Sequence, residues 1–69
     1  MVDTQLLEEE ITNSGKKKSY LADKCNCSVQ ALRLKIKGVY DFSSTQIDVL
    51  CDELGIKSLT KKEKIFFKK

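Results

Sequence analysis

The chain of 69 residues contains no histidine, no proline and no tryptophan, and it has only three cysteines. Histidine is the side chain that most often acts as a general acid or base near neutral pH. No pair of carboxylates is presented by an apolar cleft, and a chain this short can hardly enclose a substrate pocket. We therefore expect a protein that is not an enzyme.

The few cysteines and the lack of long apolar runs set further limits. Cys25, Cys27 and Cys51 are odd in number and follow no signal peptide, so we expect reduced thiols in a cytoplasmic protein. A structural zinc site needs four ligands, so the Cys25–Cys27 pair predicts neither a metal nor another cofactor. Cys27 and Cys51 are expected as small apolar core residues. No apolar run is long enough to span a membrane, and no membrane partner is expected.

Three glycines divide the chain, which has room for one domain with one small core. Gly15, Gly38 and Gly55 each follow an apolar-periodic run, at the position where a left-handed residue ends a helix. A T-x-x-E capping box at Thr60 and Glu63 predicts a last short helix that starts at residue 61. The expected fold is all-α with four or five short helices, over about residues 4–14, 17–24, 28–37, 44–54 and from 61 onward.

Apolar residues recur at helical spacing within these segments, which predicts the face that each helix buries. The residues expected to face the core are Leu7, Ile11, Leu21, Val29, Leu32, Ile36, Ile47, Leu50, Cys51 and Leu54. In the loop after the third helix, Tyr40 and Phe42 are too large and apolar to be left wholly in water.

Residues 18–37, KSYLADKCNCSVQALRLKIK, predict two short helices joined by a tight turn. Ala22 is small at a point where a bulkier side chain would hold the two helices apart. Asn26 tolerates a positive φ better than any residue except glycine, and the Ser28 hydroxyl can cap the next helix. This layout is typical of a DNA-reading helix-turn-helix, whose second helix lies in the major groove.

Three polar residues of the second helix, Gln30, Arg33 and Lys37, lie off its apolar stripe. Glutamine can bond an adenine edge through two hydrogen bonds, and arginine can do the same to guanine. The alternative for Gln30 and Arg33 is exposure without a role. Val29 either meets a thymine methyl group or packs in the core.

The net charge is only +3, but the charges are unevenly distributed along the chain. Residues 16–40 carry seven cations and one anion, whereas residues 1–15 and 41–56 each carry four anions and no cation. The basic segment coincides with the predicted helix-turn-helix, where phosphate contacts are needed. The alternative is a set of ordinary solvated helix faces.

Residues 18–37 resemble the helix-turn-helix of phage repressors and Cro-like proteins, the Xre-like group. Ala22 matches the small residue of the first helix, Cys27 the apolar residue after the turn, and Leu32 the central apolar residue of the recognition helix. Asn26 stands where the family usually has glycine, and Lys35 where many members have an apolar residue. The segments S-V-Q-A-L-R-L-K-I-K-G, Y-D-F and K-E-K-I-F-F are similar to small phage-encoded regulators of Gram-positive hosts.

The resemblance implies a lambda-repressor-like domain in the cytoplasm of a bacterium or phage-infected host cell. Its function would be that of a sequence-specific transcriptional regulator of the Cro or repressor type, with residues 28–37 in the major groove of a double-stranded DNA operator. The residues expected to contact DNA are Lys17, Lys18, Ser19, Ser28, Val29, Gln30, Arg33, Lys37 and Tyr40. Lys17, Lys18 and Ser19 are placed on the phosphates, and Lys37 and Tyr40 near the backbone.

Regulators of this kind act as two-fold dimers that read half-sites about one turn apart, ~34 Å. Ile65, Phe66 and Phe67 are consecutive and apolar, so they either pack on the core or form the homodimer contact. We expect one Phe in the core and the other at the interface. The alternative function is an antirepressor-like module that keeps the fold but binds another phage regulator, through Leu34, Lys35 and the C-terminal segment.

Overall fold

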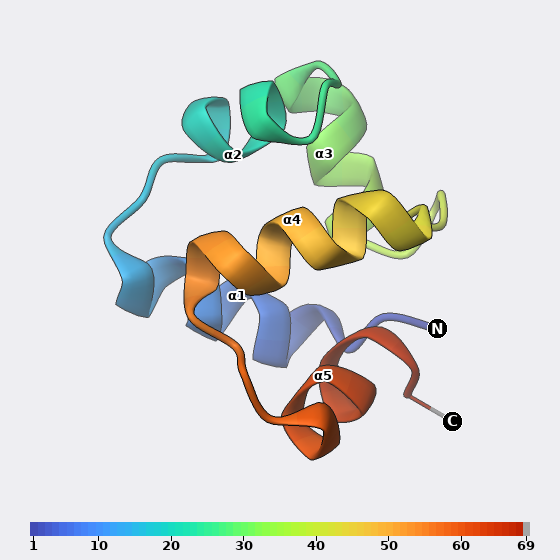
Figure 1. Ribbon diagram of the computed structural model, residues 1–69. Coiled ribbons are helices and arrows are strands. Elements are labelled where there is room, and N and C mark those ends of the chain that lie inside the picture. Colours follow the sequence, from blue (N-terminus) through green and yellow to red (C-terminus); the bar gives the residue numbers. More distant parts are fainter. Residues whose placement is uncertain (69) are drawn as a thin grey trace.

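The computed structural model describes residues 1–68, and this part of the chain contains five α-helices and no strand (Figure 1). The helices are α1 (Thr4–Ser14), α2 (Lys18–Lys24), α3 (Val29–Ile36), α4 (Ser44–Leu54) and α5 (Leu59–Phe66). The expected all-α class is confirmed. None of the helices within residues 1–68 has the length and apolar composition needed to cross a membrane.

Side-chain caps define where four of the five helices begin. The Asp3 carboxylate accepts from the Leu6 N–H at 3.1 Å, and Ser28, Ser43 and Ser58 cap α3, α4 and α5 in the same way. These caps pair N–H groups that have no partner within the helix. The first turn of α2 has no side-chain cap, because its N-cap residue is Lys17.

Left-handed residues end α1 and α4, as the glycine positions predict. Gly15 has φ 72° and Gly55 has φ 70°. After α4, the Ile56 N–H donates to the Cys51 carbonyl at 2.8 Å, and the Gly55 N–H donates to the Asp52 carbonyl at 3.3 Å. These two bonds form a Schellman ending, and the buried Ile56 side chain provides its hydrophobic contact.

The start of α5 differs from the prediction. The Ser58 hydroxyl accepts from the Lys61 N–H at 3.3 Å, and Leu59 is already helical. The predicted T-x-x-E box at Thr60 is therefore wrong, because Thr60 lies within the first turn. Both residues offer a hydroxyl, and Ser58 comes first along the chain where the backbone is still extended, with ψ 127°.

One core joins all five helices. Its fully buried large side chains are Leu7, Leu21, Leu32, Ile36, Leu50 and Ile65. Helix α1 contacts α3, α4 and α5, while α2 packs on α3 and α4. Figure 1 shows α2 and α3 together at one end of the molecule and α5 at the other. Backbone hydrogen bonds from Asp3 to Ile65 and from Lys68 to Met1 hold the two chain ends together.

Several core expectations need correction. Cys51 is buried as predicted, but Cys25 rather than Cys27 is the buried thiol near the end of α2, and Cys27 is half-buried. Val29 and Leu54 are also half-buried and pack against the core.

The three consecutive apolar residues near the C-terminus differ in how far they are buried. Ile65 and Phe66 are buried within the chain, and the rings of Phe42 and Phe66 meet edge-on with centroids 5.6 Å apart. Phe67 is 53% exposed. Of the two alternatives for these residues, core packing therefore holds for Ile65 and Phe66, and the homodimer contact stays a prediction for Phe67. The prediction of one core Phe is confirmed.

Replacing Ser58 by Ala should lower stability, because one N–H of the first turn of α5 loses its acceptor. A lost cap costs about 1 kcal/mol, which is roughly 4–8 °C in melting temperature for a domain of this size. Thr60→Ala is the matched control and should leave the melting temperature unchanged or slightly raised, since alanine is the better helix former. Thermal unfolding followed by circular dichroism measures the melting temperature of both variants. A lower melting temperature in Thr60→Ala alone would show that Thr60, and not Ser58, caps α5.

Replacing Ala22 by Leu should destabilise the domain, because Ala22 is only 1% exposed on the face of α2 that meets the core. Overpacking a core position costs ~1–3 kcal/mol. Urea unfolding at 25 °C would give the free energy directly. Serine at the neighbouring exposed position, Asp23→Ser, is the control expected to stay within about 0.5 kcal/mol of the original chain. Equal stability of Ala22→Leu and the original chain would mean that α2 packs in another register.

Candidate nucleic-acid interface

Helices α2 and α3 are joined by a turn whose backbone N–H groups form hydrogen bonds to carbonyls of α2. Asn26 has φ 59°, the left-handed conformation that its short side chain tolerates. The Cys27 N–H donates to the Ala22 carbonyl at 3.0 Å, and the Asn26 N–H donates to the Asp23 carbonyl at 3.1 Å. The Ser28 hydroxyl then accepts from the Ala31 N–H at 3.0 Å. These bonds fix the point from which α3 leaves α2.

Helix α3 has one face in the core and one in solvent. Leu32 and Ile36 are buried, whereas Gln30, Arg33 and Lys37 are exposed. The side chains predicted to read bases therefore lie together on the outer face. Val29, for which a thymine contact and core packing were both open, is half-buried and packs against the core.

Ion pairs occupy some of the cations and leave others free. The five paired lysines are Lys16, Lys18, Lys61, Lys62 and Lys68. Within residues 1–68, no carboxylate lies within ion-pair distance of the other five cations of the α2–α3 unit, Lys17, Lys24, Arg33, Lys35 and Lys37. The same holds for Lys57 and Lys64 near α5. The α2–α3 unit, residues 17–37, thus carries cations without a paired carboxylate, and two of them, Arg33 and Lys37, are exposed on the outer face of α3.

The three residues predicted to contact phosphates have different surroundings. The Lys18 ammonium lies 3.0 Å from the Glu8 carboxylate of α1, so it must leave that partner to reach a phosphate. Lys17 and Ser19 are exposed at the start of α2. Tyr40 is also exposed, in the loop after α3, while the nearby Lys35 ammonium donates to the Asp41 carbonyl at 3.0 Å.

The cysteines are poorly suited to chemistry in this structure. Burial raises the pKa of the Cys25 thiol to about 11, so that group is protonated at neutral pH. Burial also raises the pKa of Cys51. Among residues 1–68, no three Cys, Asp or Glu side chains gather closely enough to hold a metal ion. Cys25 therefore acts as a small apolar residue at the end of α2.

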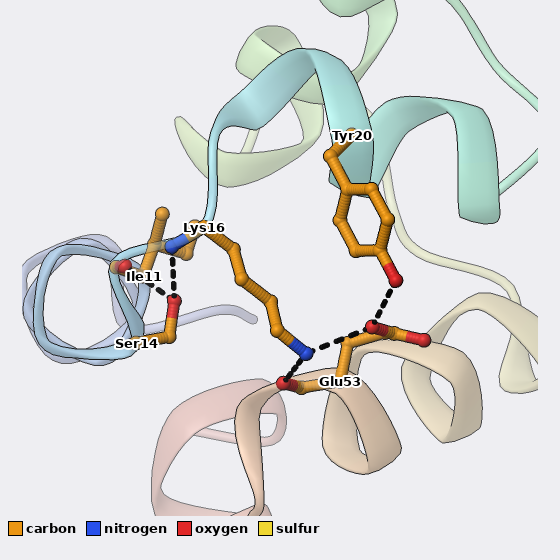
Figure 2. Close-up of polar contacts among 5 residues, drawn as sticks. All are labelled: Ile11, Ser14, Lys16, Tyr20 and Glu53. Carbon is orange, nitrogen blue, oxygen red and sulfur yellow. Dashed lines mark hydrogen bonds and ion pairs between the residues drawn. The ribbon is translucent and has the colours of Figure 1, made fainter.

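A polar network that the sequence analysis did not identify joins the α1–α2 linker, α2 and α4 (Figure 2). The Lys16 ammonium donates to the Glu53 main-chain carbonyl at 2.6 Å and to its carboxylate at 2.9 Å. The Tyr20 hydroxyl donates to the same carboxylate oxygen at 2.9 Å. Because these partners are 33 to 37 residues apart, no local pattern predicts them.

Comparison with known proteins gives no relative: no protein-family model, no curated protein and no solved structure matches this chain. Its function is therefore inferred from its own residues and their geometry.

Proposed function

We propose that this protein is a sequence-specific DNA-binding transcriptional regulator of the Cro or repressor type. In this proposal the α2–α3 unit is a helix-turn-helix, and α3 lies in the major groove of an operator. The observation that carries the proposal is the outer face of α3. It collects the exposed Gln30, Arg33 and Lys37, and no carboxylate of residues 1–68 neutralises its two cations.

The side chains of this face have the chemistry that base recognition needs. The Gln30 amide has a donor and an acceptor that match the N6 and N7 positions of adenine, and the Arg33 guanidinium matches O6 and N7 of guanine. Ser28 already accepts from the Ala31 N–H, and its hydroxyl proton remains available to a phosphate or base. Val29 contributes mainly by packing and so by fixing the angle of α3.

Phosphate contacts would come from the rim of the same surface. Lys17 and Ser19 lie exposed at the start of α2, and Lys37 and Tyr40 lie at and beyond the end of α3. Each lysine that neutralises a phosphate releases a counterion, so affinity should fall steeply with salt. Lys18 joins this set only if DNA competes successfully with Glu8.

The homodimer that we propose uses an apolar surface on the other end of the molecule. Phe67 lines three hollows, of which one is shared with Leu59 and Glu63, one with Leu6 and Lys64, and one with Met1 and Phe42. Leu59 is 69% exposed although it is a leucine at the start of a helix. The Phe67 surface, defined as Leu6, Leu59 and Phe67, gives a second copy apolar area to cover.

A second candidate function is the protein-binding module that keeps this fold and binds another regulator. It is favoured by Leu34, an exposed leucine beside Arg33 on the outer face of α3. An apolar side chain in that position suits a protein partner as well as a thymine methyl group. A gel shift against random-sequence and promoter DNA at stated salt separates the two functions, since only the regulator forms a specific complex.

Arg33→Ala should weaken binding to a duplex selected from a random pool by about 5- to 150-fold, the ~1–3 kcal/mol of one bidentate base contact. Preference at one base pair should be lost. Fluorescence anisotropy with single-base variants of the duplex measures both effects. Unchanged discrimination at every base pair in Arg33→Ala would remove Arg33 from base recognition.

A matched pair of lysine substitutions serves as the control for that experiment. Lys17→Ala should weaken all duplexes alike and lower the slope of log affinity against log salt by about one unit. Lys57→Ala makes the same charge change away from the α2–α3 unit and should keep the slope. Equal salt slopes for Lys17→Ala and Lys57→Ala would mean that Lys17 does not contact a phosphate and that DNA binds another surface.

Phe67→Ser should weaken self-association, because a two-fold contact buries the exposed half of each Phe67 ring. Burying a whole Phe contributes ~1.5–3 kcal/mol, so two half-rings correspond to about a tenfold to hundredfold change in the dimer dissociation constant. Val39→Ser, an exposed apolar residue outside the Phe67 surface, is the control. Sedimentation equilibrium with and without a two-half-site duplex measures the change, and an original chain that stays monomeric in both rejects the dimer.

A further inference from the structure

We infer that Glu53 is a positioning residue that holds α2 in the orientation in which the α2–α3 unit binds DNA. Glu53 lies in the last turn of α4, outside the surface proposed to touch DNA. This inference rests on the proposed function. It assigns a role in that function to a residue that makes no contact with DNA.

The geometry brings four side chains from three parts of the fold to one place. Figure 2 shows the Lys16 side chain reaching from the α1–α2 linker to the end of α4, with Tyr20 coming down from α2 onto the same Glu53 carboxylate. The ammonium groups of Lys16 and Lys24 lie 5.7 Å and 5.4 Å from the centre of the Tyr20 ring. Glu53 thus holds one residue before α2 and one residue within it.

The same partners stabilise the charged form of the Glu53 carboxylate. Hydrogen bonds from Lys16 and then from Tyr20 hold the pKa of Glu53 below its ordinary value. Lys16 also meets the main-chain carbonyl of Glu53, where the C-terminal end of α4 favours a positive charge. The contact is therefore formed throughout the neutral pH range.

Helix α2 needs such a contact more than the other helices do. It has only seven residues, and its first turn has no side-chain cap. Its buried apolar side chains, Leu21 and Ala22, and the buried Cys25 directly after it lie in the middle and at the C-terminal end of α2, so none of them prevents rotation of its first turn about these anchors. Bonds at Lys16 and Tyr20, toward the start of α2, resist that rotation.

The sign of a substitution separates positioning from simple electrostatics. Removing a negative charge from any protein that binds DNA reduces repulsion of the phosphates, so it should strengthen binding or leave it unchanged. A positioning role predicts the opposite for Glu53, because α2 loses its orientation. The neighbouring Asp52 is exposed on α4, and its carboxylate accepts no side-chain hydrogen bond and forms no ion pair within residues 1–68. Asp52→Ala therefore makes the same charge change without touching the network.

The experiment compares Glu53→Ala, Glu53→Gln, Tyr20→Phe and Asp52→Ala with the original chain, using a duplex that the original chain selects from a random pool. Affinity is measured by anisotropy at fixed salt, well below the melting temperature of each variant. We expect about five- to tenfold weaker binding for Glu53→Ala, the size of the net contribution of one ordinary hydrogen bond. Tyr20→Phe should be weakened without any change of charge, and Glu53→Gln, which keeps an acceptor oxygen, should recover part of the loss. Asp52→Ala should bind as tightly as the original chain or more tightly.

Amide hydrogen exchange of the free protein gives a second readout that needs no DNA. Exchange in α2 should be about fivefold faster in Glu53→Ala than in Asp52→Ala, while α3 keeps its rates. Equal DNA affinity of Glu53→Ala and Asp52→Ala overturns the inference, and so does equal exchange in α2. If the original chain selects no duplex, the proposed function fails, and the exchange of α2 alone decides whether Glu53 holds that helix.

Discussion

Burial of five apolar helix faces in one common core is the interaction on which this structure depends. The helices have 7 to 11 residues, and helices of that length are marginal in water on their own. Each one is therefore formed by its contact with the others. Because α1 contacts α3, α4 and α5, its buried Leu7 and Ile11 belong to the core that these helices share.

This dependence explains the division between the two faces of α3. Leu32 and Ile36 are buried in the core, so the polar residues off that stripe, Gln30, Arg33 and Lys37, point outward. The tight turn at Asn26 and the cap at Ser28 then fix where α3 begins. In the proposed function, the packing that stabilises the domain also presents Gln30 and Arg33 in fixed positions, and this reduces the entropy lost on binding.

The polar contacts have a different role from the apolar core. Surface ion pairs contribute only ~0–1 kcal/mol each, so the pairs Lys18–Glu8 and Lys16–Glu53 add little to stability. Their effect is on position, since they determine which lysines are occupied and how α2 lies on its neighbours. The cations of the α2–α3 unit that form no ion pair are unpaired because the fold brings no carboxylate within ion-pair distance of them.

The sequence by itself determined the local features of this protein. The all-α class, the helix ends at Gly15 and Gly55, the positive φ of Asn26 and the outward direction of Arg33 were all predictable, because backbone preference and helical period act over a few residues. Only the tertiary structure decided that Cys25 is buried rather than Cys27, that Phe66 is covered while Phe67 is exposed, and that Lys16 and Tyr20 meet Glu53. These outcomes depend on how helices distant in the chain approach each other, and the spacing of residues along one helix carries no information about that approach.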